Sequence, residues 1–318
     1  MSSNANFEEM LTQIKPKNYG YLLDFIAQVN AYTGTPIASP QLMAGRENGS
    51  KRVIMLPGSF LDFRYMEDVA QGLGSDDRYS VWGLNYPERI AGDTNSDRID
   101  RFLLVDYVGA VYQALLAMQQ SQPELRFSLV GHSLGTIVMQ MLLFVSCYNQ
   151  SHGEKTAVLP IDKIAVLGGG PPRLGFVDYV LTFTTRLHTL GIVMQMVNQP
   201  EKFISPAGGL GRTLGGKEKY QEFTRENMIY LESAPLMAEA FLRGDYAFLP
   251  AKLLEAMQVQ ALFAYSPQDL FVHQTSSRKA AEQWNAQPVA IDGGHSQMMF
   301  DETGVDLGRQ IAQFFREE

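Results

Sequence analysis

The chain has 318 residues, of which 45% are hydrophobic and 19% are charged, and its formal net charge is −8 at pH 7. This size and composition allow one large α/β domain with an insertion and a sizeable core, and they argue against a disordered chain. The acidic balance argues against nucleic acid as a partner and against general attraction to anionic membranes. No hydrophobic run approaches the roughly 18 residues of a membrane span. The N-terminus lacks the basic start and hydrophobic stretch of a signal peptide, so we expect a soluble, cytoplasmic protein.

Cys147 is the single cysteine, so an intrachain disulfide is excluded. It falls in a hydrophobic run that we interpret as a helix, where a cysteine usually serves as a small buried hydrophobic residue. No spacing of His, Cys, Asp or Glu matches a metal-ligand set, so we expect neither a metal nor an organic cofactor.

Residues 1–50 predict a helical lead-in. Hydrophobic residues recur at helical spacing from Tyr21 to Val29, and Gly34 with Pro36 ends the pattern. Residues 35–44 leave room for a short strand or hairpin.

Hydrophobic runs then alternate with helical patterns. Predicted strands cover residues 52–56, 79–84, 126–130 and 161–167, and predicted helices cover residues 65–73, 101–118 and 134–148. Such alternation requires crossover connections, which make the strands parallel and place helices on both faces of the sheet. Because both faces are then buried, the strands are hydrophobic throughout.

The alternation breaks between residues 171 and 258, where no convincing strand occurs. It resumes with predicted strands at 259–265 and 288–291 and predicted helices at 276–284 and 305–315. We therefore predict an α/β core formed by residues 51–170 and 259–318, with a helical cap at 171–258. Glycines from Gly209 onward begin a dinucleotide-binding pattern, but no strand precedes them and Leu214 occupies the third glycine position, so a lid loop is the better interpretation.

Residues 131–135 read Gly-His-Ser-Leu-Gly, between a predicted strand and a predicted helix. In this setting the pattern predicts a nucleophile elbow, a strained turn that presents Ser133 at the carboxyl end of the sheet. Glycines two residues to either side let the strand and the helix approach closely. The helix N-terminus would stabilise negative charge beside Ser133.

A serine hydroxyl needs a general base, because it is a weak nucleophile at neutral pH. Among five histidines, His295 lies in a glycine-rich loop after the last predicted strand, from which its ring can reach Ser133. Asp269 follows the preceding strand and gives the chain order Ser, Asp, His. Asp178 and Asp292 remain competing carboxylates.

An oxyanion needs two backbone donors. We expect one from Leu134, directly after the nucleophile, and the other from Ser59 in the loop after the first core strand, with Phe60 as the alternative. His132 lies inside the elbow, with its side chain expected to point away from that of Ser133.

Candidate substrate contacts are Phe60, His132 and the cap residues Phe176, Phe183 and Met194. The hydrophobic residues of the cap could pack as a cap core, or they could line the mouth of the site. The second interpretation predicts a medium to long hydrophobic acyl chain.

Four motifs resemble the α/β-hydrolase superfamily across residues 50–318: LPGSF at 56–60, GHSLG at 131–135, SPQD at 266–269 and GGHSQMM at 293–299. The resemblance implies an α/β-hydrolase fold, with a mostly parallel central sheet flanked by helices and a helical cap insertion. It also implies a triad of Ser133, Asp269 and His295, with an oxyanion hole from Ser59 and Leu134. Pro57-Gly58 stands where many members have His-Gly, and LPGSFLDF with YSVWGLNYPE looks more like the thioesterase branch, which acts on phosphopantetheine-bound acyl groups.

The activity implied by this resemblance is cleavage of an ester or thioester through an acyl-enzyme, with an acyl carrier protein as a partner if the thioesterase branch applies. A carboxylesterase or lipase, an acyltransferase or a cyclising thioesterase would use the same triad. Carbon–carbon bond hydrolysis and a non-catalytic ligand-binding role also stay open, because a fold does not fix function. The helical lead-in is similar to N-terminal helices that support dimers in some assembly-line thioesterases, which would imply a homodimer.

Overall fold

The computed structural model describes residues 16–34, 39–47, 49, 51–58, 62–86, 104–169, 199, 202, 207, 252–269, 272 and 274–317. Seven strands form one sheet in the order β1-β3-β2-β4-β5-β6-β7. They are β1 (Gln41–Gly45), β2 (Lys51–Leu56), β3 (Tyr79–Gly83), β4 (Phe127–His132), β5 (Ile161–Leu167), β6 (Gln260–Tyr265) and β7 (Gln287–Ala290). Neighbouring strands are parallel except β1 and β3, which confirms the predicted mostly parallel sheet.

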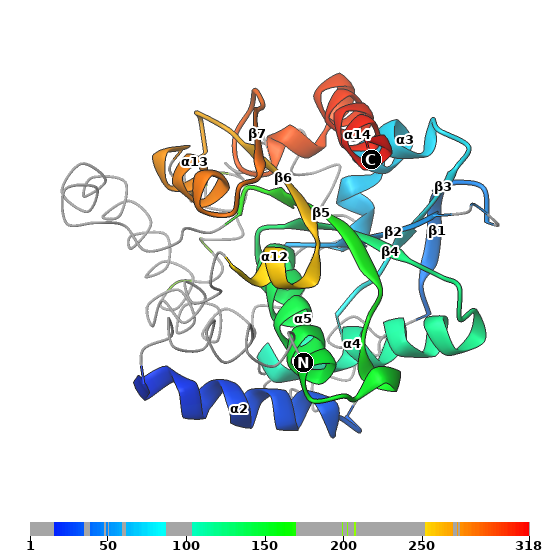
Figure 1. Cartoon of the computed structure of the whole chain (residues 1–318). Coiled ribbons are helices and arrows are strands. Elements are labelled where there is room, and N and C mark those ends of the chain that lie inside the picture. Colours follow the sequence, from blue (N-terminus) through cyan, green and yellow to red (C-terminus); the bar gives the residue numbers. More distant parts are fainter. Residues whose placement is uncertain are drawn as a thin grey trace.

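Helices flank the sheet above and below in the view of Figure 1. They are α2 (Pro16–Asn30), α3 (Glu67–Gly74), α4 (Leu104–Ser121), α5 (Leu134–Ser151), α12 (Lys252–Met257), α13 (Gln274–Gln283) and α14 (Asp301–Arg316). Helix α14 packs on α3, while α5 contacts α4 and α12 and α2 packs on α4. Helix α13 contacts β6 and β7. Short 3₁₀ turns occur at Phe63–Met66, Lys155–Ala157 and Gln297–Met299.

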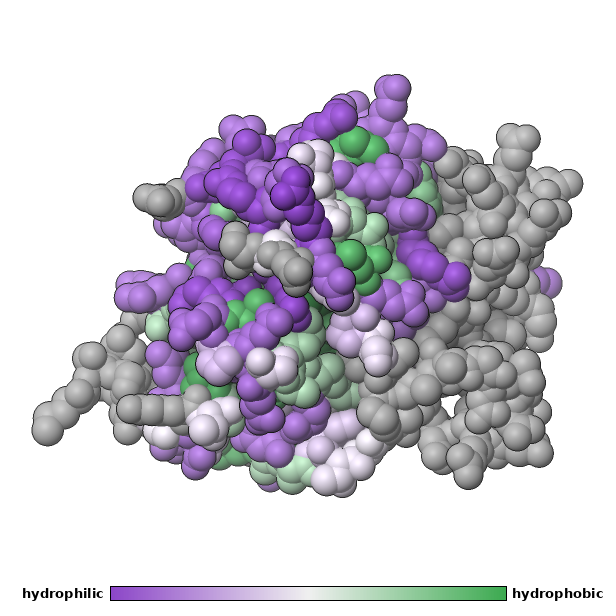
Figure 2. Space-filling view, turned by 90° about the vertical axis from the view of Figure 1, so that its right-hand side faces the viewer, coloured by the Kyte–Doolittle hydropathy of each residue, from purple (hydrophilic) through white to green (hydrophobic). Residues whose placement is uncertain are grey.

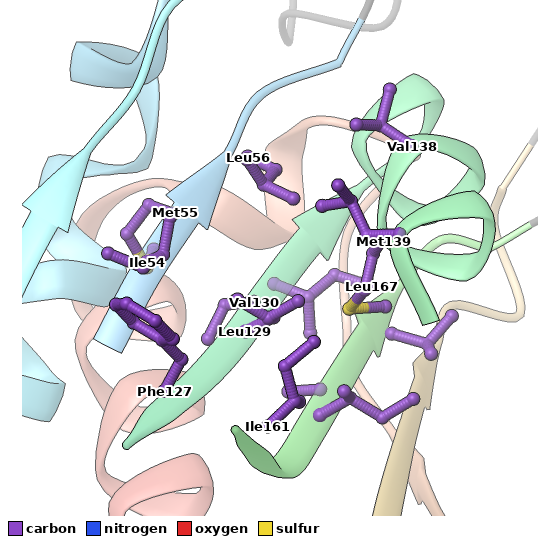
Figure 3. Packing of buried hydrophobic residues seen from close by; sticks show 14 of the residues in the cluster. Ile54, Met55, Leu56, Phe127, Leu129, Val130, Val138, Met139, Ile161 and Leu167 are labelled. Carbon is purple, nitrogen blue, oxygen red and sulfur yellow. The ribbon is translucent and has the colours of Figure 1, made fainter. Parts of the chain in front are cut away.

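The core lies where the central strands meet α5. Every residue of β4 is buried, as expected for a strand covered on both faces. Figure 3 shows side chains from β2, β4 and β5 packed side by side, with Met139 of α5 reaching toward Val130 and Leu167. All three of these side chains are fully buried. This packing fixes the end of β4 against the start of α5, where the predicted elbow lies.

The N-terminal segment contributes to the sheet as well as to the helical layer. Helix α2 matches the helical pattern predicted for this region, and β1 extends the sheet as an antiparallel edge strand beside β3. The pairing of β1 shifts between Leu42 and Ala44. Such irregularity and the exposure of β1 are typical of an edge strand.

Local hydrogen bonds and charges move some element boundaries from their predicted places. The helix predicted at 65–73 begins as a 3₁₀ turn, which the Asp62 carboxylate caps by accepting a hydrogen bond from the Arg64 N–H at 2.9 Å. The closing helix begins at Asp301 instead of residue 305, and two acidic residues in its first turn face the positive end of the helix dipole.

Most of the predicted cap at 171–258 lies outside the described residues. Its last part forms α12, which contacts α5 of the core. The described surface in Figure 2 is mostly hydrophilic, with hydrophobic residues in small areas. Among all the residues that the structure describes, no helix is both long enough and hydrophobic enough to cross a membrane.

Helices α3 and α14 meet at two glycines. A Cβ atom on Gly72 would lie 2.1 Å from the carbonyl oxygen of Val305, and one on Gly308 would lie 2.2 Å from that of Val69. We expect Gly308→Ala to lower the free energy of unfolding by about 1–3 kcal/mol, because the helices must separate to accommodate a methyl group. Urea denaturation measures this loss. The control is Gln310→Ala, at an exposed position of the same helix, and a Gly308→Ala variant as stable as this control would contradict the close packing.

Candidate active site

Ser133 lies in the turn between β4 and α5 with φ 50° and ψ −113°. This backbone conformation is strained for a residue other than glycine and costs about 1–3 kcal/mol. The Ser133 N–H donates to the carbonyl oxygen of Leu167 at 3.1 Å, and the Ser133 carbonyl accepts from the Thr136 N–H at 3.0 Å. A Cβ atom on Gly135 would lie 2.1 Å from the carbonyl oxygen of Leu56, so glycine is needed for α5 to approach β2 this closely. The turn therefore has the strained geometry expected of a nucleophile elbow.

The start of α5 is suited to an anion. The Ser133 side chain makes no capping hydrogen bond to the helix. The N–H of Leu134 is one of the first four in α5, which have no partner within the helix. No acidic residue occupies the first turn. The positive end of the helix dipole is therefore not neutralised from within the helix, and it can stabilise negative charge beside Ser133.

Asp269 and His295 form a buried pair. Nδ1 of His295 lies 2.7 Å from Oδ2 of Asp269, and the two residues are 6% and 7% exposed, respectively. A carboxylate only accepts hydrogen bonds, so Nδ1 of His295 donates, and the tautomer that can act as a base has its lone pair on Nε2. The other carboxylate oxygen, Oδ1, accepts from the Val272 N–H at 2.9 Å. Both carboxylate oxygens are thus engaged, which fixes the ring orientation.

Gly168 brings this pair next to the elbow. It follows Leu167, whose carbonyl oxygen accepts from the Ser133 N–H. A Cβ atom on Gly168 would lie 3.2 Å from both Cε1 and Nδ1 of His295 and 3.5 Å from Oδ2 of Asp269. The structure therefore gathers Ser133, Asp269 and His295 around the carboxyl end of β5.

The loops that carry Asp269 and His295 are tied together by Gln268. Its Oε1 accepts from the Gly293 N–H at 3.0 Å, and its own backbone N–H donates to Oγ of Ser266, also at 3.0 Å. Oγ of Ser266 contacts the Gly293 carbonyl oxygen as well. Sequence reasoning assigns Gln268 no role beyond membership of the SPQD motif, because nothing in the pattern links this residue to Gly293.

The loop after β2 lies against the serine. A Cβ atom on Gly58 would be 3.2 Å from Cβ of Ser133. The Gly58 N–H donates to the Tyr65 hydroxyl oxygen at 2.9 Å. Since this N–H is already engaged, Gly58 is not available as the second oxyanion donor that the sequence predicts. The candidates Ser59 and Phe60 lie outside the described residues.

Both ends of this loop are held by side chains. The Tyr86 hydroxyl donates to the Pro57 carbonyl oxygen at 2.8 Å. On the far side, the Asn85 amide donates to Asp62 at 2.9 Å. Burial pushes the pKa of Asp62 upward, but hydrogen bonds from Arg64 and Asn85 outweigh it and hold the pKa below its usual value. The carboxylate therefore stays ionised as an anchor for the loop.

His132 is 1% exposed, and its ring contacts protein groups. Its Nε2 lies 2.9 Å from the carbonyl oxygen of His295, and its Nδ1 contacts the Tyr65 hydroxyl. Burial lowers the pKa of His132 well below its usual value, and nearby His295 lowers it further, so the ring is neutral at pH 7. Of the predicted substrate contacts, His132 thus offers no free ring nitrogen to a ligand. The others, Phe60, Phe176, Phe183 and Met194, lie outside the described residues.

Rival groups are less suited to this chemistry. Burial raises the pKa of Cys147 to about 12, which keeps its thiol protonated. His152 is exposed and stacks on Tyr148, and Asp292 is exposed. The remaining alternatives, His188, His273 and Asp178, lie outside the described residues. Over the described ranges, no cluster of three or more His, Cys, Asp or Glu residues could hold a metal ion.

A profile of the alpha/beta hydrolase family matches residues 53–307. The chain belongs to this family. The match begins in β2 and ends in α14, so it contains the elbow, Asp269 and His295. No curated protein matches the chain.

Solved structures share the α/β-hydrolase fold. A hydrolase from Oleispira antarctica is 19% identical with a TM-score of 0.60, and the match covers 86% of this chain and 93% of that one. An enol-lactonase from Burkholderia xenovorans is 14% identical with a TM-score of 0.55, covering 89% and 100%. A lipase-esterase related protein from Clostridium acetobutylicum is 13% identical with a TM-score of 0.54, covering 88% and 99%. At these identities the likeness establishes the fold alone.

Proposed function

We propose that the protein is a serine hydrolase that cleaves an ester or thioester of a hydrophobic acyl group. The observation that carries this proposal is the buried 2.7 Å contact between His295 and Asp269 beside the strained turn of Ser133. A hydrolytic triad needs a nucleophile, a base and a carboxylate that orients the base, and these three residues lie together in the required chain order.

In the first step Nε2 of His295 takes the proton from Ser133 as its oxygen attacks the substrate carbonyl carbon. The N–H of Leu134, together with that of Ser59 or Phe60, stabilises the oxyanion of the tetrahedral intermediate, each donor contributing about 2.7–4 kcal/mol. His295 then returns the proton to the departing alcohol or thiol. An acyl-enzyme ester on Ser133 remains.

In the second step His295 removes a proton from water, which attacks the acyl-enzyme. The intermediate collapses, the acid leaves, and Ser133 regains its proton from His295. Asp269 accepts the hydrogen bond from Nδ1–H and holds this tautomer through both steps. The chemistry of these residues needs no metal or organic cofactor.

The acyl chain is proposed from the hydrophobic sequence of the cap around Phe176, Phe183 and Met194. A thiol carried by phosphopantetheine is the proposed leaving group, because the segments around LPGSF and YSVWGLNYPE resemble the thioesterase branch. An acyl carrier protein would then be the partner, and a homodimer supported by the N-terminal helix stays part of this proposal.

The test uses p-nitrophenyl esters and acyl-pantetheine thioesters with acetyl, octanoyl and palmitoyl chains, with Ser133→Ala as the matched variant. We expect kcat to fall by about 10⁶-fold in Ser133→Ala, because the nucleophile is lost. We expect octanoyl substrates to exceed acetyl ones by at least about 10-fold in kcat/KM, since each buried CH₂ contributes about 0.8 kcal/mol.

The outcomes separate the alternatives. Fast turnover of thioesters supports a thioesterase, whereas fast turnover of esters alone makes the protein a carboxylesterase or lipase. Equal rates for acetyl and octanoyl chains would reject the hydrophobic acyl site. Activity that survives in Ser133→Ala would reject the serine mechanism.

Two aspartates near His295 provide a matched pair of variants. We expect Asp269→Asn to lower kcat by about 10⁴-fold, because the amide stabilises the wrong histidine tautomer. Asp292→Asn removes the same charge from an exposed position and should leave kcat unchanged. Steady-state kinetics on p-nitrophenyl octanoate measure both, and the reverse order of effects would make Asp292 the orienting carboxylate.

A further inference from the structure

A buried chain of hydrogen bonds joins the two loops on either side of the elbow. It begins at the Gly58 N–H, which donates to the Tyr65 hydroxyl oxygen at 2.9 Å. The hydroxyl contacts Nδ1 of His132, and Nε2 of His132 lies 2.9 Å from the carbonyl oxygen of His295. Tyr65 and His132 are each 1% exposed. The chain therefore links the loop after β2 to the histidine loop without exposure to solvent.

The partners fix the direction of every bond. A carbonyl oxygen only accepts, so Nε2 of His132 carries the hydrogen and donates to His295. Burial keeps the ring neutral, so Nδ1 has no hydrogen and must accept from the Tyr65 O–H. The Tyr65 oxygen, in turn, accepts from Gly58. Burial also raises the pKa of Tyr65, so its hydroxyl keeps its proton.

We propose that Tyr65 and His132 are positioning residues that set the oxyanion loop and the histidine base against Ser133 through this hydrogen-bond chain. This inference rests on the proposed serine-hydrolase function. One end of the chain is Gly58, next to the expected donor Ser59. The other end is the backbone of His295, the proposed base itself.

The elbow lies between these ends, which makes the chain sensitive to small shifts. The rings of His132 and His295 are 4.7 Å apart between centroids. His132 also precedes Ser133 directly in the chain, so a shift of the His132 backbone shifts the strained turn as well. A misplacement of about 1 Å in an active site can cost about 10²-fold in rate. A purely structural tyrosine would stabilise the fold without affecting the rate of the chemical step.

Tyr65→Phe removes the central hydroxyl and keeps the ring. Its matched control is Tyr112→Phe, because Tyr112 is also 1% exposed and its hydroxyl contacts the Ala157 carbonyl and accepts from the Asn149 amide at 2.7 Å. Loss of either hydroxyl leaves buried polar groups without a partner, so both variants should have a lower Tm.

Only Tyr65→Phe should be impaired in catalysis. We expect its second-order rate of inactivation by a fluorophosphonate, and its kcat on p-nitrophenyl octanoate, to fall by about 10- to 100-fold with KM little changed. In Tyr112→Phe both rates should equal those of the wild type. A Tyr65→Phe variant that has a lower Tm but reacts as fast as Tyr112→Phe would overturn the proposal.

A second test uses the wild-type protein, so its outcome does not depend on whether a variant folds. In ¹⁵N-histidine NMR spectra, we expect His132 to be neutral from pH 5 to 8 with its hydrogen on Nε2. A hydrogen on Nδ1, or protonation in this range, would break the chain and overturn the proposal.

The failure of this inference is distinguishable from failure of the proposed function. If the fluorophosphonate does not modify Ser133 in the wild type, the serine-hydrolase function fails and the positioning role fails with it. If Ser133 is modified and Tyr65→Phe reacts at the wild-type rate, the positioning role alone fails.

Discussion

The strained backbone of Ser133 is the constraint on which the rest of the site depends. A serine at φ 50° is held there only because its surroundings leave no alternative. The Leu167 carbonyl fixes its N–H, and Gly135 lets α5 press against the end of β2. The strained turn thus follows directly on β4, a core strand that is buried along its whole length.

The remaining parts of the site are held by hydrogen bonds between loops. Gln268 ties the aspartate loop to the histidine loop, and Tyr65 and His132 tie the histidine loop to the loop after β2. The bonds of Tyr65 and His132 are buried, where hydrogen bonds are electrostatically stronger and an unpaired group is costly, whereas the bond between Gln268 and Gly293 is exposed. A displaced member therefore disturbs its neighbours, which explains how loops from four strands can keep one geometry.

The sequence predicted the alternating strands and helices of the core well, because strand and helix periodicity are local properties. The parallel order of the central strands follows from their alternation with helices, and motifs at the ends of strands make Ser133, Asp269 and His295 the site candidates. The antiparallel β1 was foreseen only as a short strand, because its pairing with β3 depends on residues about 40 positions away. A sheet contact of this kind leaves no periodic signal.

The hydrogen-bond partners of the site could not be predicted from the sequence either, because they too depend on contacts between residues far apart in the chain. His132 was a candidate substrate contact, yet its ring bonds to residues 67 and 163 positions away. Tyr65 was predicted only as part of a helix, and its hydroxyl has a role only because the fold brings Gly58 and His132 to it. Motifs identify residues that take part in chemistry, whereas the groups that hold them are set by tertiary packing.

The most direct measurement is the mass of the covalent intermediate. The protein would be mixed briefly with p-nitrophenyl octanoate, quenched in acid and analysed by intact mass and peptide mapping. We expect an added octanoyl group on Ser133. This acyl-enzyme accumulates when it breaks down more slowly than it forms. Ester turnover with an octanoyl group on a different residue, or activity retained by Ser133→Ala, would contradict the serine mechanism on which the whole account is built.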